Sequence, residues 1–242
     1  MKLVEMRALF FIVLLFAQQG WAAEIVPPTD WQLLNLKGKV KKCVVRTVTS
    51  VVVKSSLQMD IVFFEEYVFD TNGYLQSKKK YKLGDGKRKY HIYTDNIVYA
   101  KYVDQVRNLT VYGASTDIVN YGQQQWLTPT TYIMTDKVDA LSGALLVSKG
   151  EIDDKGRLLK EERLYEKEPN GIEKYSFITK NDYNKKGEKE SYDIVDGLKN
   201  KEESYYIDIT SIDRVGNPLT QTTTDDNDKV YNKSTFTYEY YK

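Results

Sequence analysis

Apolar and polar residues alternate along much of this chain, and short turns of similar sequence interrupt the alternation. Large apolar residues stand at every second position in the segments 205–209 and 236–240. A period of two is typical of a β-strand with one covered face. The segment 39–54 carries seven valines, and 61–69 is a second strongly apolar run. This density of β-branched and aromatic residues favours strands, so the pattern predicts an all-β chain.

Four of the turns share one motif, which is a large apolar residue, an Asp or Asn, two variable residues and a glycine. The Asx side chain can accept a hydrogen bond from the amide two residues on, and glycine supplies the left-handed residue that enters the next strand. Each copy is therefore expected to be a strand, a tight turn and a return strand. The predicted turn residues are Asp70 and Gly73, Asp153 and Gly156, Asn184 and Gly187, and Asp213 and Gly216.

The turn glycines are separated by 83, 31 and 29 residues. Because the first interval is about three times the others, two degenerate copies are expected inside it, which indicates a repeat architecture. The sequence predicts an antiparallel meander of repeated β-hairpins that forms a curved or partly closed sheet over residues 36–242. A split near Ala140 is the alternative boundary. Hairpin turns are expected at 94–96 and 104–108, and a single helical turn only at 136–143.

The four copies resemble the YD or RHS type of repeat. Its unit is an aromatic-containing strand, an Asp-x-x-Gly turn and a return strand that begins with Arg-Leu or a similar pair. Residues 152–158 and 69–75 match this unit best, whereas the copies at 183 and 212 keep the turn and lose the residues after it. Residues 36–41 are similar to the lead-in strand of small exported bacterial proteins with such repeats. The resemblance implies a β-strand repeat and no catalytic residue.

The N-terminus has the pattern of a signal peptide. Lys2 and Arg7 precede an uncharged run at 8–17, and Gly20-Trp21-Ala22 offers small residues at the two positions that a signal peptidase reads. Cleavage is expected after Ala22, with Ala23 as the alternative, followed by an extended lead-in at 23–35. The run is too short for a permanent transmembrane helix, which needs about 20 residues. The mature protein is expected to be soluble and exported, in the periplasm or secreted by a bacterium.

Composition adds few constraints on partners. Removing residues 1–22 takes away two basic residues and one acidic residue, which lowers the formal charge from +1 to about zero. Overall charge therefore predicts no nucleic-acid partner. Cys43 is the only cysteine, so an intramolecular disulfide cannot form.

Signatures of catalysis are nearly absent. His91 is the only histidine, and Cys43 has no evident partner base. No metal site, no cofactor and no enzymatic activity is predicted. The acidic stretch at 225–228 lacks the glycine and the terminal glutamate of an EF-hand loop, and a solvated hairpin turn is the expected role. A pair of carboxylates across a cleft would suit a glycoside hydrolase, which is the weakest of the functional hypotheses.

A basic hairpin is the most local charge feature. Alternation places its first three lysines on one face of a strand, and the returning strand brings further basic residues beside them. This hairpin is a candidate site for an envelope glycan or lipopolysaccharide, although a lysine-rich sheet edge that resists aggregation is the favoured interpretation. The candidate anion-binding residues are Lys78, Lys80, Lys82, Lys87, Arg88 and Lys89.

The aromatic residues offer a second possible surface. Trp31 and Trp126 could stack on sugars if exposed, but packing in a thin β core is the commoner use of such rings. The leading functional hypothesis is a non-catalytic structural or interaction module of the bacterial envelope, with glycan binding second. Another envelope protein is the other possible partner.

Overall fold

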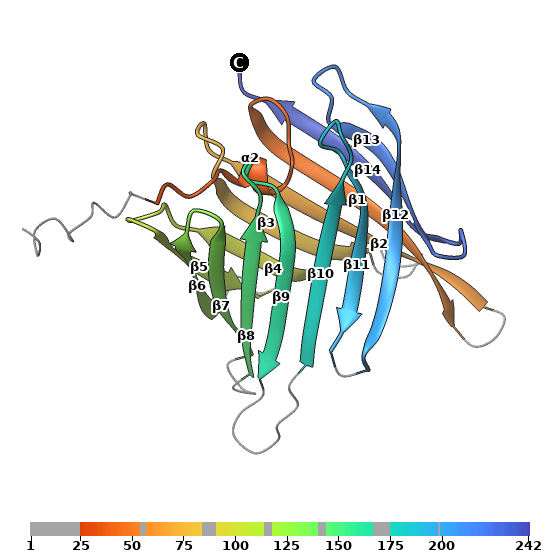
Figure 1. Cartoon of the computed structure of the whole chain (residues 1–242), viewed down its shortest axis with the longest axis horizontal. Coiled ribbons are helices and arrows are strands. Elements are labelled where there is room, and N and C mark those ends of the chain that lie inside the picture. The colour runs from red at the N-terminus through yellow and green to blue at the C-terminus, as the bar shows by residue number, and fades with distance from the viewer. Residues whose placement is uncertain are drawn as a thin grey trace, which may run out of the picture.

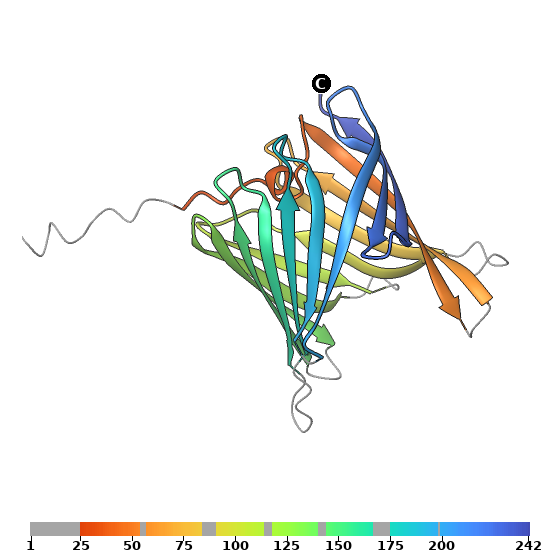
Figure 2. The ribbon, with the colours of Figure 1, turned by 45° about the vertical axis from the view of Figure 1, so that its right-hand side comes forward.

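Fourteen antiparallel strands, paired in chain order, form one sheet that closes into a barrel (Figures 1 and 2). The computed structural model describes residues 25–53, 57–83, 91–113, 118–139, 144–166, 175–197 and 199–242. The elements are α2 (Asp30–Leu33), β1 (Val40–Val53), β2 (Leu57–Phe69), β3 (Leu75–Leu83), β4 (His91–Tyr99), β5 (Val106–Tyr112), β6 (Ile118–Thr128), β7 (Thr131–Asp139), β8 (Ala144–Ile152), β9 (Leu158–Glu166), β10 (Tyr175–Tyr183), β11 (Lys189–Asp196), β12 (Lys201–Ile212), β13 (Pro218–Asp225) and β14 (Val230–Tyr240).

Closure of the barrel depends on β1, which pairs with β2 on one side and with β14 on the other. The predicted all-β antiparallel meander is confirmed, and the prediction of a partly closed sheet is corrected to a closed barrel. Closure removes the two sheet edges whose unpaired backbone groups would otherwise attract other chains. β7 and β8 pair with each other, so the alternative boundary near Ala140 does not divide the sheet.

Alternation along each strand separates a lumenal face from an outer face. On β14, Ser234, Phe236 and Tyr238 line an internal cavity, whereas Lys233 and Thr235 are exposed. Residues paired across neighbouring strands share a face, so this assignment extends around the barrel. The apolar residues of the period-two pattern thus face the lumen.

Two clusters of buried side chains form the core, and both include the N-terminal segment. Val40, Cys43, Phe69 and Leu75 form the first, against which Trp31 packs. The second consists of three buried residues, Trp126, Tyr132 and Ile152, with Leu33 packed against them. The segment before β1 is therefore part of the core.

Local structure differs from the prediction in three places. The segment 23–35, expected to be extended, contains α2, which a capping box between Thr29 and Gln32 begins. The expected helical turn at 136–143 is strand up to Asp139, and 140–143 lie outside the described residues. The expected turn at 94–96 is a register irregularity inside β4. The predicted signal peptide also lies outside the described residues, and within them no helix is long and apolar enough to cross a membrane.

Candidate functional site

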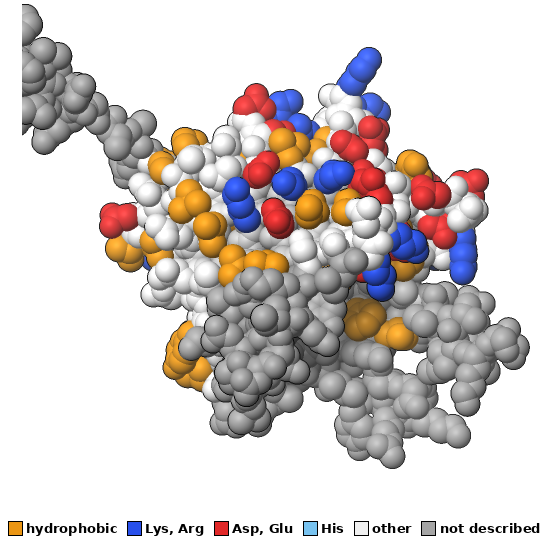
Figure 3. All heavy atoms as spheres, turned by 60° about the horizontal axis from the view of Figure 1, so that its bottom comes forward, with side chains coloured by type: hydrophobic (Ala, Val, Ile, Leu, Met, Phe, Trp, Pro, Cys, Tyr) orange, Lys and Arg blue, Asp and Glu red, His pale blue; other side chains and the backbone are white. Residues whose placement is uncertain are grey.

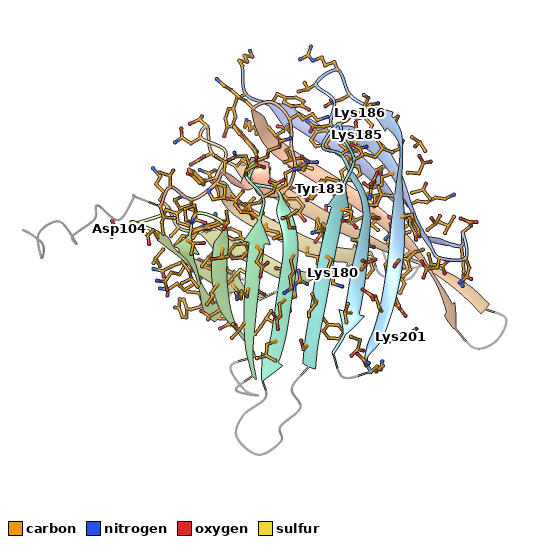
Figure 4. All side chains as sticks on the ribbon, viewed as in Figure 1. Asp104, Lys180, Tyr183, Lys185, Lys186 and Lys201 are labelled. Carbon is orange, nitrogen blue, oxygen red and sulfur yellow. The ribbon has the colours of Figure 1, made fainter. Side chains whose placement is uncertain are left out.

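The four Asx-x-x-Gly turns lie at one end of the barrel and share one geometry. Asp70 Oδ1 accepts hydrogen bonds from the amides of Asn72 and Tyr74, both at 2.9 Å. The Asx residues of the other three turns likewise accept from the amides two and four residues on, at 2.9–3.0 Å. The four glycines have φ between +80° and +96°, a region that favours glycine over other residues. Figure 4 shows Lys185 and Lys186 at the tip of one such turn.

Two more hairpins turn at the same end between the first and second copies. β4 and β5 are joined through Asp104, which has φ +56°, and β6 and β7 are joined after Thr128. Neither keeps the Asx-x-x-Gly sequence. At the opposite end the acidic stretch forms an exposed hairpin turn, in which Asp225 Oδ1 accepts from the amides of Asn227 and Lys229. No cluster in the described part of the chain could hold a metal ion.

The segment 27–38, here called the plug, crosses the end of the barrel that carries the four turns. The first half of the plug contacts the turns at Gly73 and Gly156, which match the repeat best. The amide of Trp31 donates to the carbonyl of Gly73 at 3.3 Å. A Cβ built on Gly156 would lie 3.0 Å from Cβ of Gln32 and 3.3 Å from that of Pro28. Glycine at these turns therefore also lets the plug approach closely.

The second half of the plug is hydrogen-bonded to the other two turns. Asn35 Nδ2 donates to the carbonyl of Gly187 at 2.8 Å. Buried Asn217, which follows Gly216, accepts from the amide of Lys37 at 2.7 Å and donates to its carbonyl at 2.8 Å. The four repeats thus meet a single chain segment, and together they close this end of the lumen.

An ion pair buried in the lumen holds α2 to the wall. Arg107 and Asp30 form two hydrogen bonds, at 2.7 and 2.8 Å, and both side chains are buried. Arg107 Nε donates to Gln124 at 2.8 Å, and the rings of Tyr99 and Tyr102 lie 4.7 and 4.8 Å from the guanidinium carbon. Two rings and three hydrogen bonds to side chains compensate the loss of hydration. The sequence placed Arg107 in a turn and gave no signal for this pair.

A cavity of about 390 Å³ lies in the lumen beneath the plug. It is bounded by the plug, by β9 to β14 and by β1. Its apolar lining includes Leu33, Leu36, Leu158, Ile207, Ile209 and Phe236. The volume is within the range of about 300–1,000 Å³ that is usual for small-molecule sites.

Three charged side chains, Lys37, Glu188 and Lys189, also line this cavity. Glu188 accepts a hydrogen bond from Asn184 Nδ2 at 3.0 Å. Lys189 has its Nζ 4.5 Å from the ring centroid of Tyr192, and no described carboxylate lies within ion-pair distance. Burial lowers the pKa of Lys189 to about 8.

The lumen is accessible to water at the end opposite the plug. Arg163 on β9 pairs with Phe177 on β10 and with buried Ser148 on β8. Because residues paired across neighbouring strands share a face, Arg163 and Phe177 face the lumen. Nevertheless the Arg163 side chain is 55% exposed and Phe177 is 38% exposed. Figure 4 shows Lys201, which forms an ion pair with Glu203, near this end of β12. The plug therefore crosses one end of the lumen, and the described charged side chains near the other end are exposed to solvent.

The predicted basic hairpin faces the lumen where it is described. Lys78 is paired with Tyr67, which shares a face with buried Cys43, and its Nζ lies 3.3 Å from Glu65 Oε1. The Nζ of Lys80 lies 5.7 Å from the ring centroid of Phe63.

The other hairpin residues are placed less fully. Lys82 belongs to β3, but its side chain lies outside the description, as do Lys87, Arg88 and Lys89 altogether. Lys78 and Lys80, the two candidate residues whose side chains are described, point inward, so they do not form the external glycan or lipopolysaccharide site that the sequence predicts.

Neither tryptophan offers a platform for sugars. Trp126 is fully buried. Trp31 is partly buried and donates its indole N–H to the carbonyl of Val40 at 2.8 Å. Both rings stabilise the core, as is usual in β proteins.

Cys43 is expected to be unreactive in the folded protein. Its side chain is 3% exposed, and burial raises the pKa of the thiol to about 12. Because the thiolate is the reactive form, an aromatic disulfide reagent at pH 8 should modify no thiol in the native protein and one per chain in urea. Thr235→Cys on the outer wall is the matched control and should react at once. Rapid reaction of the native wild type would contradict the buried position.

Comparisons with known proteins give likenesses to solved structures. No known protein family and no curated protein matches the sequence. A porin-like protein from Bacteroides uniformis ATCC 8492 is similar in structure, with 10% identity and a TM-score of 0.47, over 84% of this chain and 99% of that chain. A porin-like protein from Bacteroides vulgatus ATCC 8482 has 11% identity and a TM-score of 0.46, over 83% and 98%. The resemblance to YD or RHS repeats stays a prediction.

The functional hypotheses drawn from the sequence are corrected by these findings. The sequence predicted a curved or partly closed sheet that acts as a structural or interaction module, with a glycan-binding hairpin and a glycoside hydrolase as alternatives. The chain is instead a closed barrel around a cavity. The lumen, rather than the outer surface, is therefore the candidate site.

Proposed function

We propose that this chain is a barrel of the bacterial envelope that holds a small molecule in its lumen without chemically changing it. The observation that carries the proposal is the 390 Å³ cavity, which the plug covers and which apolar side chains largely line. A concave apolar site with a few polar groups is the usual form of a ligand site. The solvent-exposed end opposite the plug, where Arg163 and Phe177 lie, offers a route of entry.

The outer wall favours a barrel surrounded by water. Exposed charged side chains lie on outward positions of several strands, and Figure 3 shows both signs interspersed on the described surface. Lys42 of β1 forms an ion pair with Glu66 of the neighbouring β2 at 2.9 Å, and Lys180 of β10 forms one across β11 with Glu202 of β12, also at 2.9 Å. Each Lys or Arg on a lipid-facing strand costs about 2–4 kcal/mol at the middle of a bilayer. The outer wall is therefore too charged to form a lipid-facing band.

A membrane pore is the second candidate, and the specific observation in its favour is the closed barrel of fourteen antiparallel strands with charged residues in its lumen. An even number of strands and a polar interior are usual in bacterial membrane barrels. The plug and the charged outer wall count against it.

One experiment separates these two roles. The mature protein, residues 23–242, is purified without detergent, mixed with liposomes of phosphatidylethanolamine and phosphatidylglycerol, and floated on a density gradient. We expect the protein to remain in the aqueous fraction and to give no conductance in a planar bilayer. Native mass spectrometry of the same sample should show a monomer that takes up one molecule of decan-1-ol, a probe small enough for the cavity.

The control for uptake is Ile207→Trp, which fills the apolar part of the cavity and should abolish the decan-1-ol complex while keeping the far-ultraviolet β spectrum. Stable conductance and flotation with the liposomes would overturn the proposal in favour of a pore. Absence of any complex with the wild type would overturn the lumenal binding role.

A further inference from the structure

The cavity is lined by a charged side chain, that of Lys189, which contributes neither to a turn nor to the packing of the core. In each Asx-x-x-Gly repeat, the residue two positions after the glycine pairs with the apolar residue that precedes the Asx. Leu75 and Leu158 occupy this place in the two best copies, and both pack in the core. In the third copy the equivalent residue is Lys189, which pairs with Tyr183. A lysine therefore replaces a core leucine of the repeat.

A β-bulge directs this lysine into the lumen. Asp182 on β10 pairs with Ser191 on β11, and the next residue, Tyr183, pairs with Lys189. Glu190 is therefore the extra residue of the bulge on β11. Strict alternation from lumenal Tyr192 would have turned Glu190 inward and Lys189 outward. The bulge reverses this, because Glu190 is exposed and Lys189 lines the cavity.

The surroundings of Lys189 do not neutralise it. The ring face of Tyr192 is a weak partner for an ammonium group, worth far less than a carboxylate. Glu188 is hydrogen-bonded to Asn184, and Lys37 adds a second positive charge to the wall. A half-buried charge without a partner carboxylate is costly, and a ligand that carries the opposite charge would reduce that cost.

We propose that the lumenal ligand is a small amphiphile with one anionic headgroup, whose headgroup pairs with Lys189 and whose apolar chain packs on Ile207, Ile209 and Phe236. This inference rests on the proposed function, because it names the class of molecule that the same cavity holds. The headgroup and the chain are each recognised by a different part of the lining, which makes them separable by experiment.

Binding of such a ligand is expected to weaken as the pH rises above 8. The anion pairs only with the protonated form of Lys189, and the protonated fraction of a group with pKa about 8 falls about tenfold between pH 7 and pH 9. Tyr183 and Tyr192, which face the lysine, remain neutral over this range because burial raises the pKa of each to about 12. Lys37 and Glu188 are the other charged groups on the wall.

The test compares two probes of equal chain length, decanoate and decan-1-ol, by isothermal titration on the mature protein. For the wild type at pH 7 we expect decanoate to bind at least tenfold more tightly than decan-1-ol, and about tenfold more weakly at pH 9 than at pH 7. Lys189→Leu, which installs the residue of the two best copies, should lose the preference for decanoate, keep decan-1-ol affinity within twofold, and be no less stable in urea. Lys180→Leu on the exposed face of β10 is the matched control and should change neither affinity.

Equal affinities of the wild type for the two probes would overturn this inference and leave lumenal binding intact. So would a Lys189→Leu variant that still prefers decanoate, or a pH-independent preference. Binding of neither probe would overturn both the inference and the proposed function.

Discussion

Replacement of Asp30 by alanine is expected to destabilise the barrel by about 3–5 kcal/mol, because it leaves the Arg107 guanidinium buried without its counter-ion. Asp30 accepts two hydrogen bonds from Arg107, at 2.7 and 2.8 Å, and a third from the amide of Leu75 at 2.7 Å. The free energy of unfolding, measured by urea denaturation at pH 7, checks this value.

The matched control for Asp30→Ala is an ion pair of similar length on the outer wall. Lys180 and Glu202 are 2.9 Å apart, with side chains 50% and 54% exposed. Lys180→Ala should leave the free energy of unfolding almost unchanged, since solvent already screens the pair. Replacing Asp30 and Arg107 together by leucine should cost less than Asp30→Ala alone. A loss below 1 kcal/mol for Asp30→Ala would contradict the buried pair.

Gly73→Ala is expected to have the second largest effect, about 2–4 kcal/mol, from backbone strain together with a clash. Gly73 has φ +91°, and an added Cβ would lie 2.4 Å from Cε3 and 2.6 Å from Cδ2 of Trp31. The ring cannot withdraw without moving the plug, because Trp31 also packs against the core and is hydrogen-bonded to Val40. Urea denaturation measures the loss, and the near-ultraviolet signal of the tryptophans should change.

Gly187→Ala separates the two causes of that loss. It has almost the same backbone conformation, φ +82°, but its Cβ would meet only Nη1 of Arg157, the tip of a flexible side chain, at 2.9 Å. Strain alone predicts a loss of about 1–2 kcal/mol here. Equal losses at the two glycines would mean that contact with Trp31 adds nothing.

The strands and the four turns could be read from the sequence because their signals are local. Alternation marks the strands, and the Asx-x-x-Gly spacing is set by hydrogen bonds within five residues. Closure of the barrel has no such signal, since β1 and β14 are paired by residues as distant as Val44 and Thr237. The sequence therefore predicted a curved or partly closed sheet and left the final pairing open.

The candidate site was missed for the same reason. Alternation correctly placed Lys78 and Lys80 on one face of a strand, but which face is wet depends on the closure of the sheet. Lys189 was overlooked because a bulge, rather than strict alternation, decides where it points. Arg107 was assigned to a turn, and its partner Asp30 lies 77 residues away in a segment expected to be extended. Pairings of this kind depend on tertiary contacts.

The pairing of β1 with β14 also sets an order of events during biosynthesis. β1 leaves the ribosome early and can pair with β2 at once, but its other edge stays open until β14 has been made. Contacts so distant in sequence form slowly, because the entropy of a long loop must be lost first. Until then the growing sheet has two unpaired edges, which are templates for association with other chains. Folding of this barrel is therefore completed only after β14 has been synthesised, and until then the two open edges make the unfinished sheet prone to association.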